Sequence, residues 1–285
     1  TRITAGPELL TIQPHTSNAN RRHAMTTITS TAPTNITANN WPNIIDGRDI
    51  VGGGTEVLRA SPAHDVRVAT YHNATEAEVD AAVTAAHKAF SSGDWPRTSG
   101  AERAALLRRV AARIEAERDE LALIETLESG KPISQAKDEV ASAAGIWYYA
   151  ASLAQHAYGD AHNHLGPNSL AVTVKEPVGV VGVITPWNFP LLIVSQKLPF
   201  ALAVGCTAVI KPSDLTPGTT TRLVQILHDE WVPNGVVNLV QGGGDVGGWL
   251  SSHPGTHMTT FTGSTGVGRL VAQAAEGIAG GQHTV

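Results

Sequence analysis

The sequence predicts an α/β protein in which a helical amino-terminal part precedes a parallel sheet. Two observations predict this class. Residues 75–157 carry apolar stripes at helical spacing, and residues 178–276 alternate four short apolar runs with four helical segments. Because parallel strands need long crossovers, the second pattern is typical of a parallel sheet with right-handed helical connections.

Composition excludes several functional classes. With 42% hydrophobic and 16% charged residues among 285, the chain falls in the range of ordinary globular proteins. A single cysteine excludes a disulfide scaffold and a cysteine-rich zinc site, and it favours a reducing, cytoplasmic location. The net charge of -5 comes without a basic stripe, and no apolar run reaches the roughly 20 residues of a membrane helix. We therefore expect neither a nucleic-acid nor a membrane partner.

Residues 1–40 differ in character from the rest of the chain. They are rich in Thr, Asn and Ser and lack the apolar core of a secretory signal, so we expect a disordered leader. The first methionine is Met25, which leaves open that the residues before it are upstream sequence.

Residues 41–160 are predicted to form the helical part. Short runs at 57–58 and 66–70 indicate a hairpin or a small sheet edge. Helices are then expected at residues 75–90, 99–114, 117–127 and 134–157. The first two begin with capping boxes, Thr75 with Glu78 and Ser99 with Glu102, and the third ends at Gly130.

Residues 161–177 are expected to hold a strand pair apart from the main sheet. The alternating run 170–175 suits a sheet edge or a contact between subunits. His162 and His164 are of a type that ligates metals, but no acidic or thiol partner lies near them in the sequence. An exposed loop is the favoured interpretation, and no metal site is predicted.

Residues 178–276 are expected to form the sheet. Its strands are expected at 178–184, 208–210, 236–240 and 258–261, and its helices at 191–204, 222–231, 246–250 and 266–276, with Pro199 inside the first helix. Ligands of such sheets bind at the carboxyl ends of the strands. Functional residues are therefore sought in the turns that begin there.

The four turns at these ends are polar or rich in Gly and Pro. In the first, Asn188 lies between two prolines, and its amide suits a preorganised oxyanion donor or a cap for the next helix. In the second, Lys211 and Asp214 suit the hydroxyls of a ribose or a surface ion pair. The fourth, at 262–268, places small residues at a helix N-terminus, which suits a diphosphate or only lets the chain reverse.

Taken together, the turns resemble those of the NAD(P)-dependent aldehyde dehydrogenase superfamily over about residues 41–276. The motifs that carry the resemblance are Glu176-Pro177-Val178-Gly179-Val180, Pro186-Trp187-Asn188-Phe189-Pro190, Ile210-Lys211-Pro212-Ser213, Val237-Asn238-Leu239-Val240, His253-Pro254, Phe261-Thr262-Gly263-Ser264-Thr265 and Glu128-Ser129-Gly130-Lys131-Pro132. The resemblance implies an incomplete Rossmann-like sheet of the aldehyde dehydrogenase fold. It makes 41–160 the helical part of a cofactor-binding domain, 161–177 an oligomerisation strand pair, and 178–276 the NAD(P)-binding part.

The resemblance also assigns roles to residues. It implies that Asn188 is the oxyanion amide and that Lys211 and Asp214 hold the adenosine ribose. The pyrophosphate and adenine part of the site is implied to be lined by Gly263, Ser264, Gly266 and Val267. Further implied cofactor-binding positions in the first three turns are Ile184, Thr185, Pro186, Trp187, Ser213 and Gly244. Many NAD-preferring members have Glu where this chain has Asp214, so the implied cofactor is NAD with NADP left open.

The implied reaction is the NAD(P)-dependent oxidation of an aldehyde to a carboxylate through a thiohemiacetal, which needs a nucleophilic Cys and a base Glu. The family's Glu-Leu-Gly-Gly segment and its later Cys do not occur in this sequence, which closes with the tail 277–285. Cys206 precedes the strand at 207–210, about 16 Å from the carboxyl ends, and is expected to be a buried filler. We therefore expect a truncated chain that does not turn over alone.

Two alternatives belong to other functional classes. One is a non-catalytic nucleotide-binding or oligomerising subunit that joins full-length partners through residues 170–175. The other, a short- or medium-chain dehydrogenase, is disfavoured because no G-x-G-x-x-G follows the first strand. The family further implies a homo-oligomer and an aldehyde substrate, whose identity the sequence does not predict.

Overall fold

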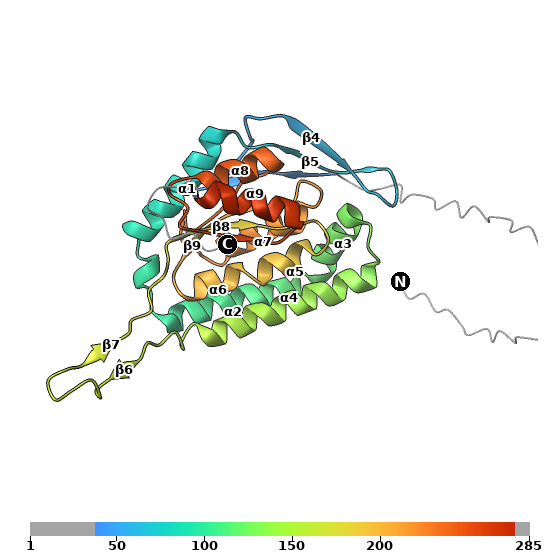
Figure 1. The fold of residues 1–285 in the computed structure, drawn as a ribbon. Coiled ribbons are helices and arrows are strands. Elements are labelled where there is room, and N and C mark those ends of the chain that lie inside the picture. The colour runs from blue at the N-terminus through green and yellow to red at the C-terminus, as the bar shows by residue number, and fades with distance from the viewer. Residues whose placement is uncertain (1–37, 277–285) are drawn as a thin grey trace, which may run out of the picture. The chain divides into compact units, whose positions relative to one another are not determined.

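The computed structural model describes residues 38–276 (Figure 1). The expected tail, and the expected leader up to residue 37, lie outside the described residues. Strand β1 (Asn39–Trp41) includes the last two residues of the expected leader, Asn39 and Asn40. Its residues pair in parallel with β5 (Arg67–His72), which also pairs with β4 (Glu56–Ala60). The expected hairpin is thus part of a three-stranded sheet.

The main sheet has six strands in the order β11-β8-β9-β10-β2-β3. The strands are β8 (Val180–Ile184), β9 (Thr207–Lys211), β10 (Val237–Leu239), β11 (Met258–Phe261), β2 (Asn43–Ile45) and β3 (Arg48–Ile50). The first four are parallel, as predicted, and follow the predicted positions. The hairpin β2-β3 extends the sheet next to β10 in antiparallel fashion, which the sequence did not predict.

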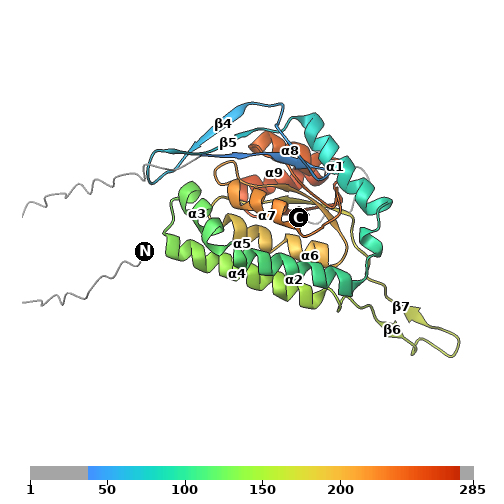
Figure 2. The same cartoon turned by 180° about the vertical axis from the view of Figure 1, so that it is seen from behind.

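Helices cover both faces of this sheet (Figures 1 and 2). One face carries α2 (Gly100–Ala116), α4 (Ile133–Leu153), α5 (Pro190–Ser195), α6 (Leu198–Ala203) and α7 (Gly218–Asp229), and the other carries α1 (Glu76–Ser91), α8 (Gly244–Ser252) and α9 (Thr265–Glu276). Successive residues of β8 alternate between the two cores, Val181 to the first and Val180 to the second. Burial on both faces explains why β8 has no polar residue.

The capping motifs form as predicted. Thr75 and Glu78 make a reciprocal capping box at α1, and Ser99 and Glu102 make one at α2. Helix α3 (Arg118–Ser129) ends at Gly130, whose φ of 77° is a left-handed conformation that favours glycine. Residues 38–276 contain no helix with the length and apolar character needed to cross a membrane.

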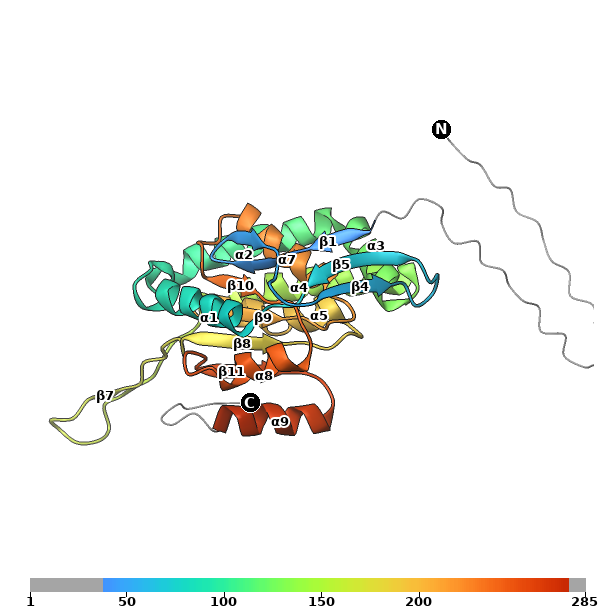
Figure 3. The same ribbon diagram turned by 90° about the horizontal axis from the view of Figure 1, so that it is seen from above.

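Two predicted elements differ in the structure. The helix expected at 191–204 is two helices, α5 and α6, because Pro199 lies in the first turn of α6, where its missing N–H costs nothing. The strand pair expected within 161–177 is shorter than predicted and consists of β6 (Ala161–His162) and β7 (Ala171–Val172). This short hairpin projects away from both helical layers (Figure 3).

Candidate functional site

A cavity of about 480 Å³ opens at the carboxyl ends of β8, β9 and β11, between those strands and helices α8 and α9. We call it the carboxyl-end cavity. Apart from Gly266, every predicted cofactor-binding residue lines it: Ile184, Thr185, Pro186, Trp187, Lys211, Ser213, Asp214, Gly244, Gly263, Ser264 and Val267. The turns that the topology was expected to bring together do meet. Their role as cofactor ligands remains a prediction.

The sequence did not predict the helical walls of this cavity. They consist of Gly247, Gly248 and Ser251 on α8 and of Leu270, Val271 and Ala274 on α9. The signal was present as helical spacing, since the lining positions of each helix recur three or four residues apart. A Cβ on Gly248 would meet no atom within 4 Å, so this wall is smooth and open toward the cavity.

Lys211 is the buried cation of the cavity. It ends β9, is only 7% exposed, and its Nζ donates to the carbonyl of Gly242 at 2.8 Å. Burial lowers the pKa of Lys211 to about 8, and the nearby carboxylate of Asp214 opposes that shift. No Lys211–Asp214 ion pair forms among the described residues, so the alternative of a surface ion pair is wrong. Lys211 therefore has N–H groups left for a ligand.

The turn after β9 presents Asp214 to solvent. Its carboxylate accepts a long hydrogen bond of 3.4 Å from the Ser213 hydroxyl, while its backbone carbonyl accepts one of 2.9 Å from the Tyr71 hydroxyl. Burial, reinforced by the charge of Asp214, raises the pKa of Tyr71, so this hydroxyl keeps its proton and donates. The turn is thus held by its backbone, and the carboxylate is free to accept hydrogen bonds from hydroxyl groups.

Two further features of the cavity suit a polar, anionic ligand. Thr185 is 4% exposed, and its Oγ1 has no hydrogen-bond partner among the described residues. A buried hydroxyl without a partner costs free energy that a ligand can recover. Helix α8 begins at Gly244 without a side-chain cap, so its first amides and the positive end of its dipole are open to the cavity.

Asn188 lies outside the carboxyl-end cavity, in the turn that joins β8 to α5. Its side chain is exposed, and the N-cap of α5 is Phe189, which makes no side-chain cap. The alternative in which Asn188 caps α5 is therefore wrong. The turn is held through backbone atoms instead, with Lys131 donating to the Asn188 carbonyl at 2.8 Å and Thr216 to the Trp187 carbonyl at 3.2 Å.

Cys206 lies at the opposite end of β9 from Lys211. It is 3% exposed, and burial raises the pKa of its thiol despite the nearby guanidinium of Arg103. The Cys206 carbonyl accepts a hydrogen bond of 2.9 Å from Trp95. A buried, protonated thiol at the far end of its strand is not a nucleophile for the carboxyl-end cavity, so the prediction of a buried filler is confirmed.

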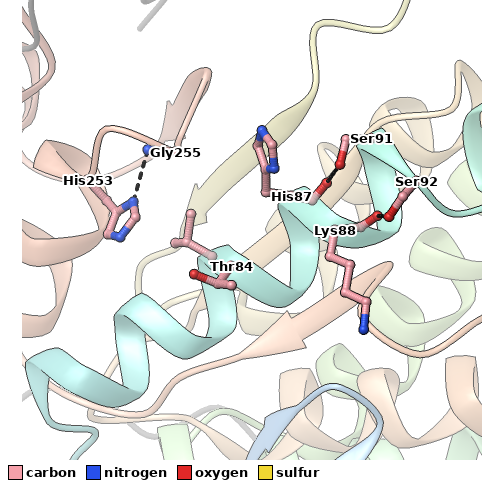
Figure 4. Close-up of a pocket in the computed structure, with 8 residues that line it drawn as sticks. Thr84, His87, Lys88, Ser91, Ser92, His253 and Gly255 are labelled. Carbon is pink, nitrogen blue, oxygen red and sulfur yellow. Dashed lines mark hydrogen bonds between the residues drawn. The ribbon is translucent and has the colours of Figure 1, made fainter.

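A second cavity, of about 280 Å³, lies beside the last turns of α1 (Figure 4). His87 and Lys88 leave the helix in opposite directions, and His253 is held by Asp80 at 3.1 Å. Within residues 38–276 no group of three or more His, Cys, Asp or Glu side chains is placed to hold a metal ion. The carboxyl-end cavity therefore remains the better candidate for function.

Comparison with known proteins agrees with this geometry. The sequence model described as "Aldehyde dehydrogenase family" matches residues 52–282. Aminoaldehyde dehydrogenase 2 of Zea mays is 40% identical over 231 residues, which are 78% of this chain and 46% of that protein. Betaine aldehyde dehydrogenase of Bacillus subtilis is 36% identical over 236 residues, which are 82% of this chain and 48% of that protein.

Solved structures show the same likeness. An NAD-dependent aldehyde dehydrogenase from Sinorhizobium meliloti superposes with a TM-score of 0.83 at 44% identity, over 85% of this chain and 49% of that one. Betaine aldehyde dehydrogenase from Staphylococcus aureus in complex with NAD+ gives a TM-score of 0.82 at 32% identity, over 85% of this chain and 48% of that one. The chain spans about half the length of the relatives it matches.

Proposed function

The chain belongs to the aldehyde dehydrogenase family, and on that premise we propose that the carboxyl-end cavity binds NAD(P). We propose further that the chain supplies the cofactor-binding part of an enzyme that oxidises an aldehyde to a carboxylate. When bound, NAD(P) accepts the hydride that leaves the aldehyde carbon. The observation that carries the proposal is the convergence of Thr185, Lys211, Asp214 and the α8 N-terminus on one cavity.

The residues of the cavity fit a dinucleotide. Lys211 and Asp214 offer a donor and an acceptor to the hydroxyls of a ribose. The open amides of α8 offer N–H donors to a diphosphate, and the lack of a side chain at Gly248 leaves room for a ligand beside this helix. Asp214 also disfavours an added phosphate on that ribose by like-charge repulsion, so NAD is the favoured cofactor.

We propose that Asn188 is the oxyanion donor of the site. Its side-chain amide makes no hydrogen bond within the described residues, so it is free to donate to an oxygen on which negative charge develops. Because Cys206 is buried at the far end of β9, we propose that the 285-residue chain itself does not oxidise aldehydes. Aldehyde-dependent formation of NADH by the purified chain, lost in Cys206→Ala, would contradict this.

A second candidate function is that of an oligomerising subunit. The observation that favours it is the β6-β7 hairpin, where Val172 of β7 and the flanking Leu170 and Val174 are 60%, 69% and 71% exposed. Exposed apolar side chains on a projecting strand pair are typical of an interface. Light scattering on the chain and on a Val172→Lys variant tests it, since an oligomer that forms through the hairpin dissociates in the variant.

The proposal of NAD binding is tested by filling the cavity without harming the fold. In Gly248→Leu the new side chain enters the cavity from α8, while the exchange of Gly for Leu adds up to about 1 kcal/mol of helix stability. Gly145→Leu in α4 is the matched control, because its Cβ also meets no atom and it lies outside the cavity.

Isothermal titration with NAD+ is expected to show binding to the unchanged chain and to Gly145→Leu, and none to Gly248→Leu. Both variants are expected to unfold at or above the temperature of the unchanged chain. Equal affinity in all three proteins, or no binding by the folded unchanged chain, would overturn the proposal.

A further inference from the structure

A largely buried lysine, Lys131, contacts the turn that carries Asn188. Lys131, which follows the C-cap of α3, is 9% exposed in its side chain, and its Nζ lies 2.6 Å from Glu125 Oε1. The same Nζ makes a short ion pair with Glu139 of α4 and donates to the Asn188 carbonyl at 2.8 Å. An ammonium group has three N–H donors, and here each has an acceptor.

Lys131 also contacts the residue that follows Asn188. Its Nζ lies 4.8 Å from the centre of the Phe189 ring, within the range of a cation–π contact. One side chain thus fixes the turn at two consecutive residues, by a carbonyl and by a ring. The backbone of the turn is also held by the hydrogen bonds from Thr216 to the Trp187 carbonyl and from the Ile193 amide to the Phe189 carbonyl.

The carboxyl groups of Glu125 and Glu139 hold the Lys131 ammonium, and their pKa values shift in opposite directions. Burial raises the pKa of Glu125 well above its ordinary value, and its hydrogen bond with Glu139 acts in the same direction. Burial alone would also raise the pKa of Glu139, but hydrogen bonds with Glu125, Lys131 and Gln135 outweigh it and hold that pKa low. The opposite directions of these two pKa shifts favour one proton held between the two carboxyl groups, so that the remaining carboxylate balances the ammonium.

We propose that Lys131 is a positioning residue for the oxyanion amide of Asn188. This inference rests on the proposed function of Asn188. Glu125 and Glu139 would hold a lysine at the joint of α3 and α4 without any contact to the turn. The third N–H is directed instead at the carbonyl of the residue whose amide must point at the substrate. A rigid backbone costs less reorganisation when charge develops on the bound oxygen.

The experiment observes the Asn188 carbonyl itself. Asn188-Phe189 is the only Asn-Phe step in the sequence, so protein made with carbonyl-13C asparagine and 15N phenylalanine gives a single HNCO peak. The measurement contains no cofactor, so its outcome is independent of whether the chain binds NAD+. Lys137→Met is the control, because Lys137 lies on α4 and its ammonium pairs, among residues 38–276, only with the exposed Asp119.

In Lys131→Met the Asn188 carbonyl shift is expected to move and the Phe189 order parameter to fall, while both stay unchanged in Lys137→Met. In the unchanged chain the Phe189 N–H is expected to be rigid, with an order parameter of about 0.85. An unmoved peak in folded Lys131→Met, or an equal shift in Lys137→Met, would refute the positioning role. If Lys131→Met does not fold, an order parameter below about 0.6 in the unchanged chain refutes it by itself.

Discussion

Replacing Lys211 with Met is expected to make the protein more stable and its cofactor binding weaker. The side chain of Lys211 is 7% exposed, and its Cδ lies 3.5 Å from the position of a Cβ on Gly247, so its stem is packed against α8. Met has a similar length and keeps this packing. The substitution therefore removes chiefly the ammonium group and its bond to the Gly242 carbonyl.

The gain in stability follows from the pKa of Lys211. A fall from 10.5 to about 8 corresponds to about 3 kcal/mol of unfavourable free energy for the charged form in the folded state. Loss of the bond to Gly242 offsets about 1 kcal/mol of this. Because the folded pKa is lowered, the cost is full below pH 8 and disappears as the pH rises toward 10.5. We expect Lys211→Met to be about 1–2 kcal/mol more stable at pH 7, and to gain less at pH 10.

Although Lys211→Met is expected to be more stable, it is expected to bind NAD+ more weakly. A hydrogen bond from a charged donor contributes about 1.5–3 kcal/mol, so the Kd for NAD+ should rise roughly 10- to 150-fold. Titration calorimetry at pH 7 and urea unfolding at pH 7 and 10 measure the two effects. Lys197→Met is the matched control, since Lys197 is also partly buried but bonds Thr260, outside the cavity. Unchanged NAD+ affinity in Lys211→Met, or a loss of stability at pH 7, would refute the reasoning.

Two further predictions concern buried groups away from the cavity. Glu128 accepts bonds from Trp41 Nε1 at 2.9 Å and from the Gly218 amide at 2.8 Å on different oxygens, so Glu128→Gln turns an NH2 group toward one donor. Burial raises the pKa of Glu128 to about 7, so its ionisation lowers the stability of the folded protein as the pH rises from 4.5 to 7. Urea unfolding at pH 5 and pH 8 is therefore expected to show a smaller fall in stability in Glu128→Gln than in the exposed Glu120→Gln. The thiol of Cys206 is expected to react with a thiol reagent only after unfolding, and rapid labelling of the folded chain would contradict its burial.

Much of the fold could be predicted because its signals are local. A capping box such as Thr75 with Glu78 needs only four residues, and β9 shows itself as an apolar run before a polar turn. The hairpin β2-β3 was not predictable in this way, because strands of three residues are too short to show a period. Its place is fixed by buried Asn43, which accepts a bond of 2.6 Å from the Gln241 amide 198 positions later in the chain.

The cavity could be predicted for a different reason. Parallel strands align their carboxyl ends, so the topology alone brings Thr185, Lys211 and Gly263 to one edge of the sheet. The hydrogen bond from Lys131 to the Asn188 carbonyl could not be predicted, because Lys131 lies between α3 and α4, 57 positions earlier in the chain. No sequence pattern says which carbonyl a lysine will reach, since that depends on how two helices pack against the turn.

The two buried lysines differ in the number of N–H groups that the protein itself uses. Lys131 donates its three N–H groups to Glu125, Glu139 and the Asn188 carbonyl. It therefore has no N–H group left to bind a ligand. Lys211 donates one N–H group to the Gly242 carbonyl and makes no other hydrogen bond among the described residues, although it is buried. Leaving a buried cation short of acceptors lowers the stability of the unliganded protein. That cost is expected where a ligand supplies the missing acceptors, which supports the proposed roles of Lys211 in cofactor binding and of Lys131 in positioning the turn.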